Sequence, residues 1–330
     1  MLKALYMGLS AYLPLAYPHE LRESISRKVH ILPPIGEGAA WKQHGSILAE
    51  AEVILATWGM PVLDAEFLAA APRLRAVFYA AGSVKHFATP ESYERGIQIT
   101  SAWQANALPV AEYALATILL GLKKFWLANR LMQNGQFSRA LSSHYGICGA
   151  NVGLVSMGSI GQRVAMHLSK HELNVLAYDP FLDTKVAAEM GVTLVSLSQL
   201  FEESDVVSIH TPWLPETEKM IDGPLLRTMR SGASLINTSR GAVIDEKGLC
   251  EVLEERPDLT AVLDVTYPEP PTEDSLLRHL DNVILTPHIA GSMGGEIARM
   301  GAWMLGELDN YLNNRPLEYE ISQERLIHMA

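Results

Sequence analysis

The feature that most constrains the fold is a repeated alternation of short apolar segments with longer helical patterns along the 330-residue chain. Eight of these segments are rich in apolar and β-branched residues: 53–55, 76–79, 152–155, 175–178, 206–209, 234–236, 261–263 and 283–285. Strands that alternate with helices form βαβ units with parallel strands. Right-handed crossovers cover both faces of such a sheet, so its strands are apolar throughout. The sequence therefore predicts an α/β protein.

The composition is that of a folded globular chain, with 48% apolar and 19% charged residues. A net charge of −11 repels phosphate backbones and anionic lipid, so we expect neither nucleic acid nor a membrane as a partner. The longest uninterrupted apolar stretch, 113–122, is shorter than the roughly 20 residues that span a bilayer. Cys148 and Cys250 are too few for a disulfide framework and are not spaced as a zinc site. We therefore expect no metal and a reducing, cytoplasmic location.

One helical pattern is much longer than the others. From Asn106 to Leu131, apolar residues recur every three or four positions over about seven turns. This segment is apolar around most of its circumference, so it should be buried or covered by a partner subunit. We place a domain boundary near residue 101, before this helix.

A glycine turn follows the strand at 151–155. It reads Ser156-Met157-Gly158-Ser159-Ile160-Gly161 and leads into a helix from about Gln162 to Lys170. A dinucleotide-binding turn needs a tight bend, a point where the backbone can approach the pyrophosphate, and a close contact between helix and sheet. Here Ser156 replaces the first glycine, and its Cβ is tolerable only if φ stays negative. The motif by itself is also compatible with an ordinary glycine-containing βα turn.

The next strand ends at Asp179, which is where an acceptor for the adenosine ribose hydroxyls belongs. An aspartate that simply opens a turn before Pro180 is the alternative. Because no Lys or Arg follows Asp179 until Lys185, the sequence offers no obvious partner for a 2′-phosphate. The combination favours a dinucleotide cofactor, with NAD (NADH) favoured over NADP.

Three further strand ends carry Arg240, Glu269 and His288. Singly, these residues could be a surface ion pair, a solvated acid and a structural histidine. Together, at the carboxyl edge of one parallel sheet, they form a set that can perform acid–base chemistry on an anion.

The ordered motifs of the chain resemble the D-isomer-specific 2-hydroxyacid dehydrogenase family from about Val53 to Tyr311. The motifs that carry the resemblance are AAGSVKHF (80–87), RGIQIT (95–100), the NALPVAEYALATILL helix, the glycine turn with YDP, LINTSRGAVIDE (235–246), LDVTYPEP (263–270) and TPHIAG (286–291). Residues 1–52 match the family weakly.

The resemblance implies two doubly wound parallel-sheet lobes. A Rossmann NAD-binding domain, 102–291, is inserted in a flavodoxin-like substrate domain made of 1–101 and 292–330, and the active site lies in the cleft between them. The cofactor-binding residues implied are Gly158, Ser159, Ile160, Gly161, Asp179, His210, Thr211, Pro212, Thr238, Ser239, Arg240, Asp264, His288 and Gly291. Among them, Ser159 and Ile160 face the pyrophosphate and Asp264 the nicotinamide carboxamide.

The resemblance also assigns the catalytic roles. Arg240 binds the carboxylate and carbonyl oxygens of a 2-oxo acid, His288 exchanges a proton with the hydroxyl, and Glu269 pairs with His288. A planar, always-charged guanidinium suits two adjacent oxygens, and a protonated imidazole stabilises the charge that grows on the carbonyl oxygen. The substrate-binding residues implied in the outer lobe are Ala81, Gly82, Ser83 and Trp58.

Trp58 stands where family members that use phosphorylated substrates tend to offer an arginine. A tryptophan in the hydrophobic core is the alternative interpretation of this residue. If Trp58 does line the cleft, a pocket without a fixed cation leaves a phosphate unpaired, so we expect small unphosphorylated 2-oxo acids.

The family and the apolar 106–131 helix together predict a homodimer built on the cofactor domains. Two alternatives to a dehydrogenase use related architectures. The first is an NAD(H)-sensing binding protein or corepressor on the same fold, and the second is a Rossmann-type transferase, which would not need Arg240, Glu269 and His288.

Overall fold

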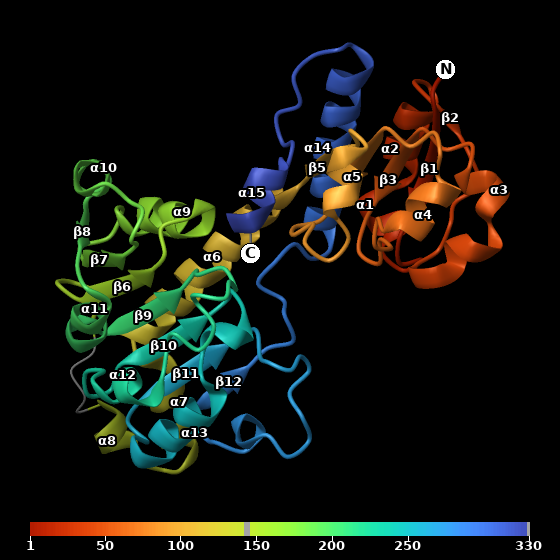
Figure 1. Cartoon of the computed structure of the whole chain (residues 1–330). Helices are drawn as coiled ribbons and strands as arrows, with labels where there is room; N and C mark the ends of the chain where they lie inside the picture. The colour runs from red at the N-terminus through yellow and green to blue at the C-terminus, as the bar shows by residue number, and fades with distance from the viewer. Residues whose placement is uncertain (142–145, 329–330) are drawn as a thin grey trace. The chain divides into compact units, whose positions relative to one another are not determined.

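The computed structural model describes residues 1–141 and 146–328, and the chain divides into two compact units. Unit 1 consists of Met1–Ala107 and the chain from Ser292 onward, and unit 2 consists of Leu108–Gly291. Each unit contains one fully parallel sheet with helices packed on it (Figure 1). The predicted α/β class is confirmed. The division falls inside a helix that begins in unit 1, whereas we expected the boundary before that helix.

Unit 1 has a five-stranded sheet in the order β2-β1-β3-β4-β5. Its strands are β1 (Lys3–Met7), β2 (His30–Ile31), β3 (Val53–Ala56), β4 (Ala76–Tyr79) and β5 (Gln98–Ser101). Its helices are α1 (Leu13–Ala16), α2 (His19–Ser26), α3 (Gly45–Leu48), α4 (Ala65–Ala70), α5 (Pro90–Glu94), α14 (Gly295–Leu312), α15 (Gln323–His328) and the 3₁₀ helix η1 (Gly38–Gln43). The strand order reverses between β1 and β3.

Unit 2 has a seven-stranded sheet in the order β12-β11-β10-β9-β6-β7-β8. Its strands are β6 (Asn151–Val155), β7 (Asn174–Tyr178), β8 (Val192–Leu194), β9 (Val206–Ile209), β10 (Ser234–Asn237), β11 (Thr260–Leu263) and β12 (Val283–Leu285). Its helices are α7 (Phe125–Gln133), α8 (Phe137–Leu141), α9 (Ser159–Leu168), α10 (Thr184–Glu189), α11 (Leu197–Glu203), α12 (Gly223–Arg227), α13 (Glu246–Glu255), η2 (Gly241–Val243) and η3 (Leu276–Arg278). The order reverses between β6 and β9.

The apolar strands are explained by burial on both faces. In β1, Leu5 and Met7 pack in one core cluster, while Ala4 and Tyr6 pack in the cluster on the opposite face. The strands of unit 2 divide in the same way between two clusters. All eight predicted strands are present. Four further strands, β1, β2, β5 and β8, were not predicted from the sequence.

The long helix is interrupted. We predicted one helix over 106–131, but the structure has α6 (Trp103–Leu122) followed by α7. Lys124 adopts a left-handed conformation, φ 49°, at the start of α7, and this ends the continuous helix. Among the described residues, α6 is the one helix that is long and apolar enough to cross a membrane. Its uninterrupted apolar stretch, 113–122, is nevertheless shorter than the roughly 20 residues that span a bilayer. Of its most apolar window, 56% is buried in the protein, as in a core helix.

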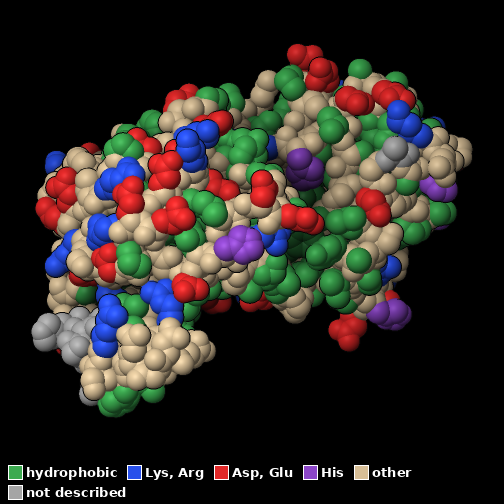
Figure 2. Space-filling model, turned by 90° about the horizontal axis from the view of Figure 1, so that it is seen from below, with side chains coloured by type: hydrophobic (Ala, Val, Ile, Leu, Met, Phe, Trp, Pro, Cys, Tyr) green, Lys and Arg blue, Asp and Glu red, His purple; other side chains and the backbone are tan. Residues whose placement is uncertain are grey.

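Acidic and basic side chains are interspersed on the molecular face shown in Figure 2. Both signs of charge are therefore present on this face, while the chain as a whole carries an acidic excess with its net charge of −11.

The glycine turn after β6 contains a serine in a conformation that favours glycine. Ser156 has φ 76°, so our expectation that φ must stay negative is wrong. The Ser156 N–H donates to the Tyr178 carbonyl at 2.8 Å, and the Ser156 carbonyl oxygen would lie 2.2 Å from a Cβ placed on Gly161. Neighbouring backbone therefore holds this residue in a conformation that costs about 1–2 kcal/mol outside glycine.

We predict that Ser156→Gly raises the free energy of unfolding by roughly 0.5–1 kcal/mol, because relief of strain exceeds the added entropy of the unfolded chain. Urea denaturation measures the change. Ser169→Gly is the matched control: Ser169 ends α9 at φ −59°, without this strain, so its replacement should destabilise the protein. A lower urea midpoint for Ser156→Gly would contradict the prediction.

Candidate active site

The turn between β6 and α9 presents an open backbone surface. A Cβ added to Gly158 would meet nothing within 4 Å, whereas one on Gly161 would collide with the Ser156 carbonyl. No side chain caps α9 at Gly158, so the first N–H groups of the helix, including those of Ser159 and Ile160, have no partner within the helix. A helix N-terminus of this kind binds phosphate groups.

Asp179 is fixed against the same turn. Its Oδ2 accepts from the Met157 N–H at 2.7 Å, and its Oδ1 accepts from the Phe181 N–H at 2.8 Å. The carboxylate of Asp179 therefore organises the turn, as the alternative interpretation expected, and each of its oxygens keeps a lone pair that could accept a further hydrogen bond.

Two buried polar atoms at the ends of the neighbouring strands β9 and β10 lack a protein partner among the described residues. They are Nδ1 of His210, which follows β9, and Oγ1 of Thr238, which follows β10. Burial lowers the pKa of His210 to about 4, so its ring is neutral at neutral pH, and Nε2 lies 3.1 Å from Ser208 Oγ. Thr211 Oγ1 donates to the Val155 carbonyl. Orphaned atoms, an open glycine and a free helix N-terminus fit a polar, phosphate-bearing cofactor.

Pro212 and Ser239 continue these two loops. Pro212 is half-buried, and Ser239 is buried, with both its N–H and its hydroxyl donating to Asn237 Oδ1. Gly291 is half-buried and is the last residue of unit 2.

Arg240 lies at the end of β10. Its Nη1 donates to the Ser239 carbonyl at 2.7 Å. Burial lowers the pKa of Arg240 and the charge of Glu269 opposes that shift, so the guanidinium remains a cation. The next residue, Gly241, leaves no room for a side chain, because a Cβ there would lie 2.0 Å from the Thr266 carbonyl carbon. The start of the loop that carries Glu269 thus packs directly against Gly241.

Glu269 and His288 are in direct contact. Glu269 Oε1 lies 2.8 Å from His288 Nδ1, and the two side chains are 41% and 47% exposed. This contact engages Nδ1 and leaves Nε2 for a reacting group. His288 also has a left-handed backbone, φ 56°, which is a strained conformation for a histidine.

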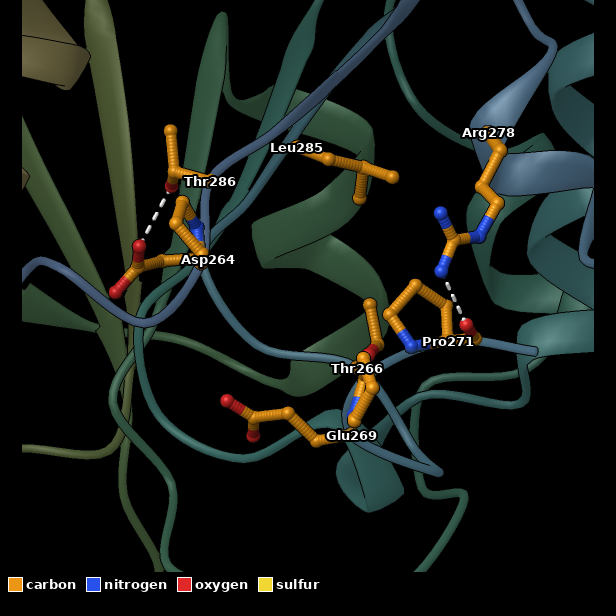
Figure 3. Close-up of a pocket in the computed structure, with 9 residues that line it drawn as sticks. Asp264, Thr266, Glu269, Pro271, Arg278, Leu285 and Thr286 are labelled. Carbon is orange, nitrogen blue, oxygen red and sulfur yellow. Dashed lines mark hydrogen bonds between the residues drawn. The ribbon is translucent and has the colours of Figure 1, made fainter. Parts of the chain in front are cut away.

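Asp264 holds that strained segment in place, a role that sequence reasoning missed. The carboxylate is buried and accepts from Thr286 Oγ1 at 2.6 Å (Figure 3). It also accepts from the Ile289 N–H at 2.9 Å and from the Ala290 N–H at 2.8 Å. Its backbone carbonyl accepts from the His288 N–H at 3.0 Å. Only contacts between separate strand ends disclose this role.

A cavity of about 710 Å³ lies beside these groups. Its lining includes Thr266, Glu269, Arg278, Leu285 and Thr286 (Figure 3). The cavity belongs entirely to unit 2. Among the described residues, no cluster of three or more His, Cys, Asp or Glu side chains could hold a metal ion.

The remaining predicted residues lie in unit 1, at the carboxyl edge of its own sheet. Trp58 follows β3, and Ala81, Gly82 and Ser83 follow β4. Ser101 Oγ donates to the Ala81 carbonyl at 3.0 Å. Trp58 is half-buried, and its ring contacts that of Tyr12 with 4.9 Å between centroids. Tyr12, which follows β1 across the switch in strand order, was not found from the sequence.

The chain matches the family model described as D-isomer specific 2-hydroxyacid dehydrogenase, NAD binding domain, over residues 115–290. It is 36% identical to a glyoxylate reductase of Korarchaeum cryptofilum over 243 residues, which cover 72% of this chain and 73% of that protein. It is 32% identical to a D-3-phosphoglycerate dehydrogenase of Archaeoglobus fulgidus over 260 residues, 79% of this chain and 49% of that protein. The chain thus spans about half the length of that second relative.

Solved structures show the same two-unit fold. A phosphoglycerate oxidoreductase from Rhizobium etli superposes with a TM-score of 0.79 at 25% identity, covering 97% of this chain and 98% of that one. The TT0316 protein from Thermus thermophilus gives 0.76 at 26% identity, covering 97% and 100%. The fold and site define a protein with a dinucleotide-binding sheet unit. The chain belongs to the D-isomer specific 2-hydroxyacid dehydrogenase family, and 115–290 match its NAD-binding domain.

Proposed function

We propose that this protein is an NAD(H)-dependent oxidoreductase that interconverts a small D-2-hydroxy acid and its 2-oxo acid. The observation that carries the proposal is the Glu269–His288 contact at 2.8 Å on the same sheet edge as the half-buried cation Arg240. A cation for an anionic substrate and an acid–base pair at adjacent strand ends are what carbonyl reduction next to a carboxylate requires.

Each residue has a task in this mechanism. A bound nicotinamide supplies the hydride. Gly158, Ser159 and the start of α9 hold the pyrophosphate, and Thr238 and His210 offer their unpartnered atoms to the cofactor. Arg240 orients the carboxylate and the carbonyl oxygen with its planar fork. His288 delivers a proton from Nε2 to that oxygen, while Glu269 stabilises the imidazolium through Nδ1.

Substrate selection rests on the unit 1 residues that the family resemblance assigns to the substrate. The surroundings of Trp58 are aromatic and acidic: Tyr12 contacts its ring, and Glu37 packs against Gly59 and accepts from the Ser10 N–H. Burial lowers the pKa of His86, so this residue is not a fixed cation. A phosphate would meet the Glu37 carboxylate near this aromatic pair, which favours an unphosphorylated substrate.

The assembly that we propose is a homodimer through unit 2. Four large apolar side chains on the consecutive helices α6, α7 and α8 are 39–59% exposed: Leu120, Phe125, Met132 and Phe137. Exposed apolar side chains of this size favour a partner surface.

The first prediction concerns catalysis. His288→Ala should lower kcat by roughly 10²–10⁴-fold, the range for general acid–base help, while NADH binding measured by fluorescence titration is retained. Glu269→Gln should move the alkaline limb of the reduction profile to lower pH, because the protonated imidazole loses its stabilising charge. His279→Ala, an exposed histidine in the same unit, is the control. Near-normal turnover by His288→Ala would refute the mechanism.

The second prediction is that NADH supports turnover about tenfold or more better than NADPH, because Asp179 repels a 2′-phosphate. Asp179→Asn removes the charge and keeps an acceptor for the Met157 N–H. It should therefore lower the ratio of kcat/KM with NADH to kcat/KM with NADPH. Asp179→Ser should also narrow it, with added damage to the turn. Equal kcat/KM for both cofactors in the wild type would count against this role of Asp179.

The third prediction is that hydroxypyruvate or glyoxylate is reduced with a higher kcat/KM than 3-phosphohydroxypyruvate. Steady-state kinetics with hydroxypyruvate and its phosphate ester give a direct comparison. A preference for the ester would show that another basic group, such as Lys85, serves the phosphate.

The fourth prediction is the assembly. Light scattering at micromolar concentration should give about twice the chain mass of 36.3 kDa. Phe125→Asp should shift the mass toward that of the single chain, since it places a charge in the apolar surface. A wild-type mass of one chain would exclude the dimer.

A further inference from the structure

The loop that carries Glu269 runs from the end of β11 to η3 over the carboxyl edge of the unit 2 sheet. Its middle is open to solvent: Tyr267 is 54% exposed and the Glu269 side chain 41%. Yet Glu269 contacts His288 at 2.8 Å. An exposed loop keeps such a contact only if other groups restrict its conformations, since ordering a residue costs about 1–2 kcal/mol.

The geometry points to Trp213 and Arg278 as positioning residues that clamp this loop on either side of Glu269 and so maintain its contact with His288. This inference rests on the proposed function, because it concerns the acid–base pair of that reaction. Neither residue was assigned a role by the sequence motifs.

Trp213 holds the loop before Glu269. Its ring contacts Tyr267 edge-to-face, with 5.0 Å between centroids and 63° between planes. The contact forms although both rings are substantially exposed, at 39% and 54%. Trp213 itself is fixed by its Nε1–H, which donates to Glu218 Oε2 at 3.3 Å. Aromatic pairs in this arrangement stabilise beyond the area that they bury.

The sheet order explains how this contact reaches across the site. The strands lie in the order β11-β10-β9, Tyr267 follows β11 and Trp213 follows β9. The ring pair therefore spans the end of β10, which carries Arg240. The close approach of Gly241 to Thr266 lies beneath the same span. The Trp213–Tyr267 contact therefore joins the Glu269 loop to the loop after β9, on the other side of the β10 end that carries Arg240.

Arg278 holds the loop after Glu269. Its Nη2 donates to the Pro271 carbonyl at 2.6 Å (Figure 3). Its Nε donates to the Thr272 carbonyl at 2.9 Å. Arg278 belongs to η3, which is anchored by the buried Leu277 and by Ser275 Oγ bonded to Glu246. In Figure 3 the Glu269 side chain extends away from Arg278, so the guanidinium fixes the loop backbone and leaves the carboxylate to His288.

The kinetic test uses Trp213→Ala and Arg278→Met, assayed in the direction of reduction with hydroxypyruvate or glyoxylate. Each should lower kcat about three- to tenfold with little change in KM for NADH, and move the alkaline limb of the pH profile in the same direction as Glu269→Gln. Trp213→Phe keeps a ring and should restore the wild-type profile. Arg227→Met, which breaks an exposed ion pair with Glu255 in the same unit, is the matched control.

The double variant Trp213→Ala/Glu269→Gln separates positioning from general damage. If Trp213 acts through Glu269, the double variant has the same pH profile as Glu269→Gln alone. A further shift in the double variant, or an unchanged profile in Trp213→Ala, would overturn the inference.

Hydrogen exchange of the apoprotein tests the clamp without turnover. Amides in the peptide over 265–272 should exchange faster in Trp213→Ala and Arg278→Met than in the wild type, in Trp213→Phe or in Arg227→Met. Unchanged exchange in both clamp variants would refute the clamp even in an active enzyme. Conversely, a wild type that reduces no 2-oxo acid but shows faster loop exchange in the variants would refute the proposed function and leave the clamp established.

Discussion

The site of unit 2 depends on the hydrogen bonds that the buried carboxylate of Asp264 accepts. An ionised group can be buried only when hydrogen bonds compensate for its lost hydration. Here the Thr286 hydroxyl and the Ile289 and Ala290 N–H groups do so. Because these donors flank His288, the same bonds hold the histidine backbone in its left-handed conformation. The Tyr113 hydroxyl, 3.0 Å from Thr286 Oγ1, extends the network to α6.

The parallel sheet determines where the remaining polar groups lie. Strands buried on both faces are mostly apolar along their length, so the charged groups and most polar groups collect where each strand ends. Arg240, Glu269 and His288 follow the neighbouring strands β10, β11 and β12, while the glycine turn and His210 flank the reversal between β6 and β9. A guanidinium cation, a carboxylate–imidazole pair and a glycine turn at a helix N-terminus thereby share one edge of one sheet.

Unit 1 follows the same rule with different side chains. Its strand order reverses between β1 and β3, and the loops after these strands supply Tyr12 and Trp58, whose rings are in contact. Gly59 permits the close approach of this turn to Leu9 and Glu37, since a Cβ there would lie 2.9 Å from both. The result is an aromatic and acidic edge, in contrast with the cationic Arg240 edge of unit 2.

The sequence alone determined the α/β class, the eight strands with continuous apolar character and the set Arg240, Glu269 and His288, because these depend on local patterns and on the order of motifs along the chain. It did not determine that α6 ends before Lys124, which has a left-handed backbone. It also did not determine that Ser156 carries a positive φ, since neighbouring backbone holds that residue in place. Nor did it disclose the Tyr12–Trp58 and Trp213–Tyr267 ring pairs or the bonds of Asp264. These contacts join residues far apart in the chain, and only the packing of strands into a particular order brings them together.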